Sequence, residues 1–203
     1  MDPRKAADHL AAVFLGLAVL AAVSSCSSVP PTVNSVASAY LAACDSNPEA
    51  TPSPTPYGTP VFGLLEYPNS PTKWPIWSID GGGVSSGVGW YENTSGPGVV
   101  GNMVVASVTD TDAKKSYQSM MRLAAGDVVK ITTCTSIFTY KVTVPPSTRT
   151  MGATDTRPFE LDPDNPGAAP TVALLTMIAI PGFNPPVGTY YVGFAVLTGT
   201  TPR

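Results

Sequence analysis

The sequence predicts an all-β domain, a closed barrel of short strands with one or two short helices. Two observations predict it. The chain has 22 prolines and 18 glycines, which is typical of a fold with many turns. From Val61 onward, the apolar segments are short and rich in valine, threonine and isoleucine, the residues that favour strands. Because closure removes exposed sheet edges, we expect residues 61–203 to form a barrel, with a sandwich as the alternative.

The first 25 residues predict a signal for export. An unbroken apolar run at 10–23 is too short for a bilayer core, which needs about twenty residues. The residues that follow, Val23 to Cys26, resemble the bacterial lipobox, in which the cysteine is lipidated and becomes the mature N-terminus. A plain secretory signal is the alternative. We expect 1–25 to be a lipoprotein signal peptide, and acylated Cys26 to hold the chain on the extracytoplasmic face of the cell membrane.

Residues 26–60 predict a tether between this anchor and the barrel. Five prolines stand among threonine, serine and glycine between Pro48 and Pro60, which is typical of an extended linker. A short helix is expected within the tether at 35–44. Apart from Cys26 the chain has two cysteines, Cys44 and Cys134. In an oxidising compartment they either form a disulfide or remain two separate buried thiols.

Within the barrel, the segment 136–144 shows the clearest strand pattern. Phe138 and Tyr140 alternate with Thr139 and Lys141, and a preceding apolar segment lies close enough to form a hairpin. The expected strands are 99–108, 127–133, 136–144, 171–180 and 188–197. One helix is expected at 113–123, where Tyr117, Met120 and Met121 stand at helical spacing and should contact the core.

Composition excludes several kinds of chemistry. The net charge is −3 and no basic patch is present, so nucleic acid is not an expected partner. The one histidine is His9, inside the predicted signal peptide. The exported chain would therefore lack the base of Ser–His and Cys–His sites and an imidazole metal ligand. The acidic segment 160–165 does not have EF-hand spacing and predicts an exposed turn, and we expect no metal or cofactor.

A series of motifs between Trp74 and Leu197 resembles the sortase family. The family pattern GWY…PG..GN.V.A is similar to Gly89–Tyr91, Gly96–Gly98 and Gly101–Ala106. The family segments F..L..L..GD, Y.V and LTLIT are similar to Tyr117–Asp127, Tyr140–Val142 and Leu174–Ile178. The resemblance implies an eight-stranded β-barrel. In active sortases it also implies transpeptidation by a cysteine nucleophile, a histidine and an arginine that stabilises the oxyanion.

All three catalytic positions of the family carry other residue types here. The histidine position falls at Val108, the cysteine position at Ile180 and the arginine position near Tyr190. The resemblance therefore implies a pseudo-sortase without catalytic residues. Its groove would be lined by Trp90, Tyr91, Ser107, Val108, Ile180 and Tyr190. Such an apolar groove would suit an extended envelope peptide, a protein segment or a lipid-like group.

Two other functions stay open. A residual hydrolase or transpeptidase would use Ser107, activated by Lys114 or Lys115, and this needs a desolvated lysine. A purely structural envelope lipoprotein would have the groove filled by its own side chains. The sequence predicts no particular oligomeric state.

Overall fold

The computed structural model describes residues 32–49, 60–79, 88–108, 114–152, 154–181 and 189–203. These residues belong to one compact unit, Pro31–Arg203. The predicted signal peptide, Cys26 and most of the proline-rich segment lie outside the described residues. None of the described helices is long and apolar enough to cross a membrane.

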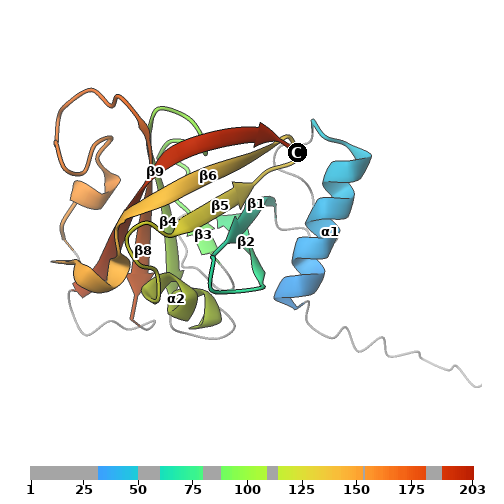
Figure 1. Cartoon of the computed structure of the whole chain (residues 1–203), viewed down its shortest axis with the longest axis horizontal. Coiled ribbons are helices and arrows are strands. Elements are labelled where there is room, and N and C mark those ends of the chain that lie inside the picture. Colours follow the sequence, from blue (N-terminus) through green and yellow to red (C-terminus); the bar gives the residue numbers. More distant parts are fainter. Residues whose placement is uncertain (1–31, 50–59, 80–87, 109–113, 153, 182–188) are drawn as a thin grey trace, which may run out of the picture. The chain divides into compact units, whose positions relative to one another are not determined.

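Eight of the nine described strands close into a barrel, which confirms the predicted architecture (Figure 1). Along the sheet the order is β6-β5-β1-β2-β3-β4-β8-β9-β7, and a further pairing between β6 and β9 closes the ring. β7 pairs with β9 and lies outside the ring. The strands are β1 (Val61–Glu66), β2 (Lys73–Ser78), β3 (Val88–Trp90), β4 (Gly101–Val108), β5 (Val128–Thr132), β6 (Ser136–Val144), β7 (Thr150–Gly152), β8 (Ala173–Ile180) and β9 (Thr189–Pro202).

The predicted elements are found close to their expected bounds. The hairpin of β5 and β6 is antiparallel, and β8 lies between β4 and β9 as a central strand. The helix α2 (Lys114–Met121) matches the one expected at 113–123, and Met120 is fully buried against the core. Two 3-10 turns, η3 (Pro146–Thr148) and η4 (Arg157–Phe159), lie in the long connection between β6 and β8.

The interior of the barrel is one hydrophobic core to which all eight ring strands contribute. Because side chains alternate along a strand, every second residue of β4 and β8 points inward. These are Met103 and Val105 on β4, and Leu175 and Met177 on β8, all fully buried. The residues between them point outward, where a second cluster covers the sheet.

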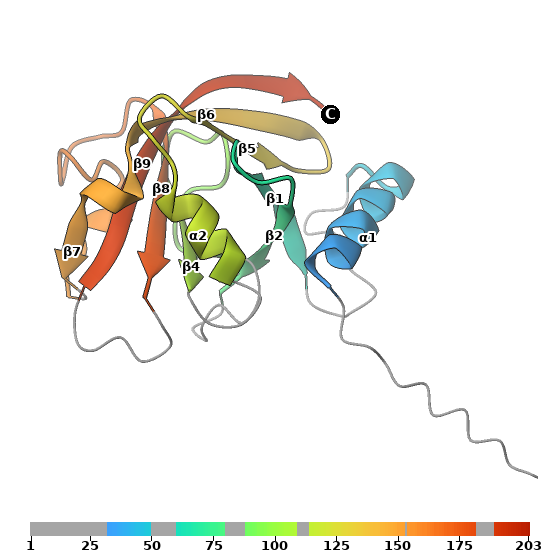
Figure 2. The same ribbon diagram turned by 60° about the horizontal axis from the view of Figure 1, so that its bottom comes forward.

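The helix α1 (Val33–Ser46) is part of the folded unit, which corrects the predicted boundary of the tether at residue 60. It lies alongside β1 and β2 (Figures 1 and 2) and buries Val36, Ala37, Tyr40 and Cys44. These residues recur at helical spacing on one face, and that face packs on Val61 and Leu64 of β1. A disulfide joins Cys44 to Cys134 in the β5–β6 turn.

The two ends of the barrel differ in what they carry. β4 and β8 run parallel, so their carboxyl ends, Val108 and Ile180, lie at the same end. In Figure 2 both arrowheads point to the end where α1 begins. The β5–β6 turn with Cys134 lies at the opposite end, beside the C-terminus, where the backbone N–H of Arg203 donates to the carbonyl of Thr135 at 3.0 Å.

Candidate functional site

The outward face of β4 and β8 forms the floor of the candidate site. Val104 and Ala106 on β4 and Ile178 on β8 point away from the barrel interior and are 0–3% exposed. The half-buried side chains packed against this floor are Ile79, Tyr91, Ile180 and Tyr190. We call these seven residues the outer-face cluster. It is entirely apolar and aromatic.

Val108 and Ile180 are direct neighbours in the β ladder. They are paired in register as the last residues of two parallel strands, although 72 positions separate them in the sequence. The inward-pointing neighbours Ser107 and Ala179 pair one step earlier, and both are fully buried.

Tyr190 reaches the same cluster from β9. This strand runs antiparallel to β8, and Tyr191 pairs with Ala179, so Tyr190 emerges beside the end of β8. Tyr91 completes the aromatic side: its ring meets that of Phe159 edge to face, with centroids 4.9 Å apart. Burial raises the pKa of the Tyr91 phenol, and the nearby Tyr190 phenol raises it further. The Tyr91 phenol therefore stays protonated at neutral pH and is a poor base or nucleophile.

A buried amide fixes the loop that flanks this face. The Asn102 side-chain amide donates to the carbonyl oxygens of Pro158 and Glu160 at 2.8 and 2.9 Å. Its own side-chain oxygen accepts a hydrogen bond from the Thr176 hydroxyl at 2.7 Å. Because a fully bonded buried amide is costly to break, it holds η4, and with it Phe159, against the sheet.

Sequence and fold comparisons agree on the family. The sortase domain family matches residues 65–179, more than half of the chain. The chain belongs to the sortase family. No curated protein sequence matches it significantly.

Solved sortase structures share this fold. Sortase E from Streptomyces avermitilis is 26% identical, with a TM-score of 0.56, over 70% of this chain and 90% of that one. The SrtA sortase of Actinomyces oris is 22% identical, with a TM-score of 0.57, over 70% and 81%. The sortase D5 transpeptidase of Clostridium perfringens is 21% identical, with a TM-score of 0.56, over 81% and 99%.

Three of the six predicted groove residues lie at the outer face of this sortase domain, and the backbone of a fourth is paired with one of them. Tyr91, Ile180 and Tyr190 belong to the outer-face cluster, and Val108 is the ladder partner of Ile180. The other two belong elsewhere.

Trp90 packs against the central core and stacks on Phe62, with ring centroids 4.4 Å apart. Ser107 is buried on the inward side of β4, which carries Met103 and Val105. The strand alternation explains both corrections, because Trp90 precedes Tyr91 and Ser107 precedes Val108 by one residue.

The cysteines of the described residues are unavailable as nucleophiles. Cys44 and Cys134 form a disulfide with their Cα atoms 4.8 Å apart, and a nucleophile must be a free thiolate. Cys134 also lies at the barrel end opposite Ile180. The structure thus resolves the two alternatives for this pair in favour of the disulfide.

The two arginines in the connection between β6 and β8, Arg149 and Arg157, are held in ion pairs. Arg149 pairs with Asp164 at 3.0 Å and lies over the Phe194 ring, 4.8 Å from its centroid. Arg157 pairs with Asp155 and holds the pKa of that carboxyl at about 2. The part of the chain that the structure describes has no group of three or more His, Cys, Asp or Glu side chains placed to hold a metal ion.

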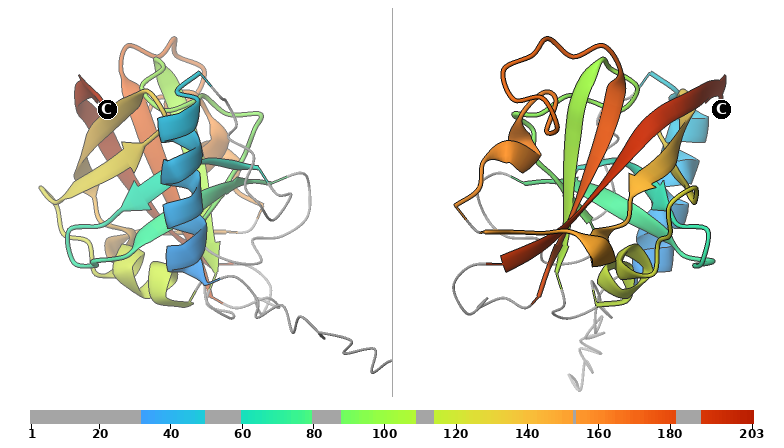
Figure 3. Two further views of the ribbon diagram at one scale, coloured as in Figure 1. Left: turned by 90° about the vertical axis from the view of Figure 1, so that its right-hand side faces the viewer. Right: turned by 60° about the vertical axis from the view of Figure 1, so that its left-hand side comes forward.

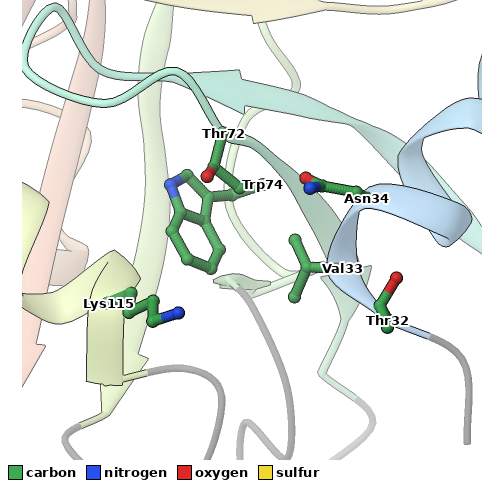
Figure 4. A pocket seen from close by; sticks show the side chains of 6 residues that line it. All are labelled: Thr32, Val33, Asn34, Thr72, Trp74 and Lys115. Atoms are coloured by element: carbon green, nitrogen blue, oxygen red, sulfur yellow. The ribbon is translucent and has the colours of Figure 1, made fainter.

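Lys115, one of the two lysines considered for Ser107, has an exposed side chain. It lines a pocket of about 240 Å³ between the start of α1, the start of β2 and α2. Figure 4 shows it facing Trp74 and Val33 of this pocket. Because this side chain is exposed to solvent, Lys115 does not supply the desolvated base that Ser107 would need. The side chain of Lys114 lies outside the description.

Proposed function

We propose that this sortase domain is catalytically inactive, and that it binds an extended surface peptide or protein segment at its outer face. The ladder pairing of Val108 with Ile180 carries the proposal. Two positions that align with the family's histidine and cysteine stand side by side at the ends of β4 and β8. Neither side chain can transfer a proton or attack a carbonyl, and losing one member of such a unit costs about as much as losing all of them.

The outer-face cluster offers a surface of the right character for a peptide. Ile180, Tyr91 and Tyr190 are half-buried, and Phe159 beside them is 39% exposed. Apolar and aromatic side chains of this kind bind extended segments through contacts with alternate side chains. The sortase E1 of Streptomyces coelicolor, which shares the fold at 21% identity and a TM-score of 0.51, holds a tripeptide in its active site.

Peptide titration tests the binding. We expect a peptide carrying a sorting motif to raise the melting temperature of the purified chain, and Tyr190→Ala to weaken that effect at least about tenfold in apparent Kd. Val128→Ala, on β5 and outside the cluster, is the matched control because Val128 is also partly exposed. A melting temperature that does not respond to any sorting-motif peptide would instead favour the purely structural lipoprotein.

The proposal also places the domain outside the cell membrane on a lipid anchor at Cys26. A diacylated cysteine gives stable attachment without a spanning helix. In a bacterial host, the full chain should incorporate labelled palmitate and sediment with membranes, whereas Cys26→Ser should do neither. Unchanged labelling of Cys26→Ser would contradict the anchor but would leave the peptide-binding proposal standing.

A further inference from the structure

The exposed apolar side chains of the described residues gather at the barrel end opposite Val108 and Ile180. Four of the six large ones lie there, whereas Phe159 lies beside the outer-face cluster and Val128 lies on β5. Four are close to half exposed: Val99 at 56%, Val100 at 54%, Leu161 at 52% and Val172 at 44%. Single exposed apolar residues are ordinary, but a contiguous group on a monomer indicates a contact surface.

These four residues lie close together around Gly101, and we call them the valine–leucine patch. The backbone N–H of Gly101 donates to the carbonyl of Val172 at 3.0 Å, so Val100 lies beside Val172. A Cβ atom placed on Gly101 would lie 3.5 Å from a methyl group of Leu161. In the right panel of Figure 3, the orange loop that contains Leu161 and Val172 lies beside the start of β4.

A hollow adjoins the patch and shares Val99 with it. It has a volume of about 250 Å³ and lies between α1, the turn before β4 and the β5–β6 turn. Aromatic and apolar side chains dominate its walls, namely Tyr40, Phe62, Pro97, Val99 and Phe138. An exposed apolar patch next to an aromatic hollow can receive an anchoring side chain of a partner.

The charges around the patch are mostly negative. The segments 92–102 and 155–172 carry five carboxylates and one arginine: Glu92, Asp155, Glu160, Asp162, Asp164 and Arg157. Asp155 pairs with Arg157, and Asp164 pairs with Arg149. Glu92, Glu160 and Asp162 have no ion-pair partner among the described residues. Glu160 and Asp162 flank Leu161 in the sequence, so the patch has two carboxylates without an ion-pair partner beside it.

We propose that the valine–leucine patch and the hollow form a second docking site, separate from the outer-face cluster, for a protein segment in which apolar residues are flanked by lysine or arginine. An aliphatic or aromatic side chain would fill the hollow, and the flanking cations would meet Glu160 and Asp162. The same carboxylates would be repelled by an anionic lipid surface, which attracts basic rather than acidic protein surfaces.

Three short fluorescent peptides test this site with the purified chain: KKLWLKK, EELWLEE and KKSGSKK. We expect only KKLWLKK to bind, and its binding to weaken as salt rises. Val100→Ser and Leu161→Ser should each weaken it about tenfold. Serine is used because it removes the apolar contact without adding charge. Val128→Ser is the matched control and should leave the Kd unchanged, while Glu160→Gln with Asp162→Asn should weaken binding and flatten its salt dependence.

Any of several results would overturn the proposal: no binding of KKLWLKK, equal binding of EELWLEE, or equal loss with Val128→Ser. A dimer that Val100→Ser dissociates would assign the patch to a second copy of the chain instead. Melting temperatures of the serine variants should match wild type, since the replaced side chains are exposed, and this separates lost binding from lost folding. Tyr190→Ala should leave the affinity for KKLWLKK unchanged, so the experiments test this site and the outer-face site independently.

Discussion

The Thr176 hydroxyl on β8 donates to the side-chain oxygen of Asn102 on β4, across 2.7 Å in a fully buried position. Through its amide, Asn102 also holds two carbonyl groups of the loop that contains η4. One side chain therefore fixes both the floor of the outer face and the loop that flanks it. Because the bonds to Thr176 and to the Pro158 carbonyl are buried, their loss leaves buried polar atoms unsatisfied.

Asn102→Ala should destabilise the domain by about 2–4 kcal/mol, since it leaves the Thr176 hydroxyl and two carbonyl groups without their partner. Denaturant unfolding measures this loss, and hydrogen exchange should show faster exchange in the η4 loop. Asn93→Ala is the matched control, because Asn93 is exposed in a nearby turn. Equal stability of the two variants would contradict the role assigned to Asn102.

The Cys44–Cys134 disulfide should contribute about 2–5 kcal/mol to stability, because it closes a loop across a sequence separation of 90 residues in the unfolded chain. Urea unfolding of the Cys44→Ser, Cys134→Ser double variant measures it. Adding reductant should lower the unfolding free energy of wild type to that of the double variant. It should leave the unfolding free energy of the double variant unchanged. A wild type that reductant does not affect at any urea concentration would contradict this contribution.

Tyr140 should make the fold sensitive to alkali. Its hydroxyl accepts a hydrogen bond from the Gly98 N–H at 2.8 Å, and burial raises its pKa from 10.0 to about 12. Because the folded-state pKa is the higher one, this contribution is complete below pH 10 and is lost as the pH rises to 12. Its size is about 2–3 kcal/mol.

Unfolding free energies at pH 7, 10 and 11.5 test this, with Tyr140→Phe as the comparison. The variant should be about 1 kcal/mol less stable at pH 7, because the Gly98 amide loses its acceptor. It should also lose less stability than wild type above pH 10. Both proteins should still lose some stability in alkali, because burial also raises the pKa of Tyr40 to about 12. Parallel pH profiles for wild type and variant would contradict the assignment.

Gly98 should tolerate no side chain. Its φ of +76° is rarely adopted by other residues, and a Cβ atom would lie 2.2 Å from the Phe138 ring. Gly98→Ala is expected to cost about 2–4 kcal/mol through backbone strain and the forced movement of that ring. Gly167→Ala is the control: it shares a positive φ of 84° but meets no atom within 4 Å, so it isolates the backbone part. A loss no larger than that of Gly167→Ala would contradict the steric part.

Periodic patterns predicted the strands whose apolar residues recur at a fixed spacing. Features that depend on contacts between distant parts of the sequence were not predicted. The alternation in 136–144 and the apolar runs at 171–180 and 188–197 predicted β6, β8 and β9. The burial of α1 on β1 was not predicted, because helical spacing reveals an apolar face but not its partner.

The candidate site was likewise predicted only in part. The family motifs placed the histidine position at Val108 and the cysteine position at Ile180, and the register of β4 and β8 brings these two residues together. Trp90 was misplaced because a shift of one residue moves a side chain to the other face of a strand. The role of Asn102 was not predicted, because its hydrogen-bond partners on β8 and in the η4 loop follow it by 56 to 74 positions.

The most direct test of an inactive outer face compares wild type with a triple variant. The variant carries the family's three catalytic residue types through the substitutions Val108→His, Ile180→Cys and Tyr190→Arg. Each protein is incubated with a sorting-motif peptide and an amine acceptor, and intact mass and ligated product are measured. The account predicts no acyl adduct and no ligated product for wild type, and a thiol-linked adduct on Cys at position 180 of the variant. A wild-type chain that forms an acyl adduct on a barrel residue and releases ligated product, with both lost in Ser107→Ala, would contradict it.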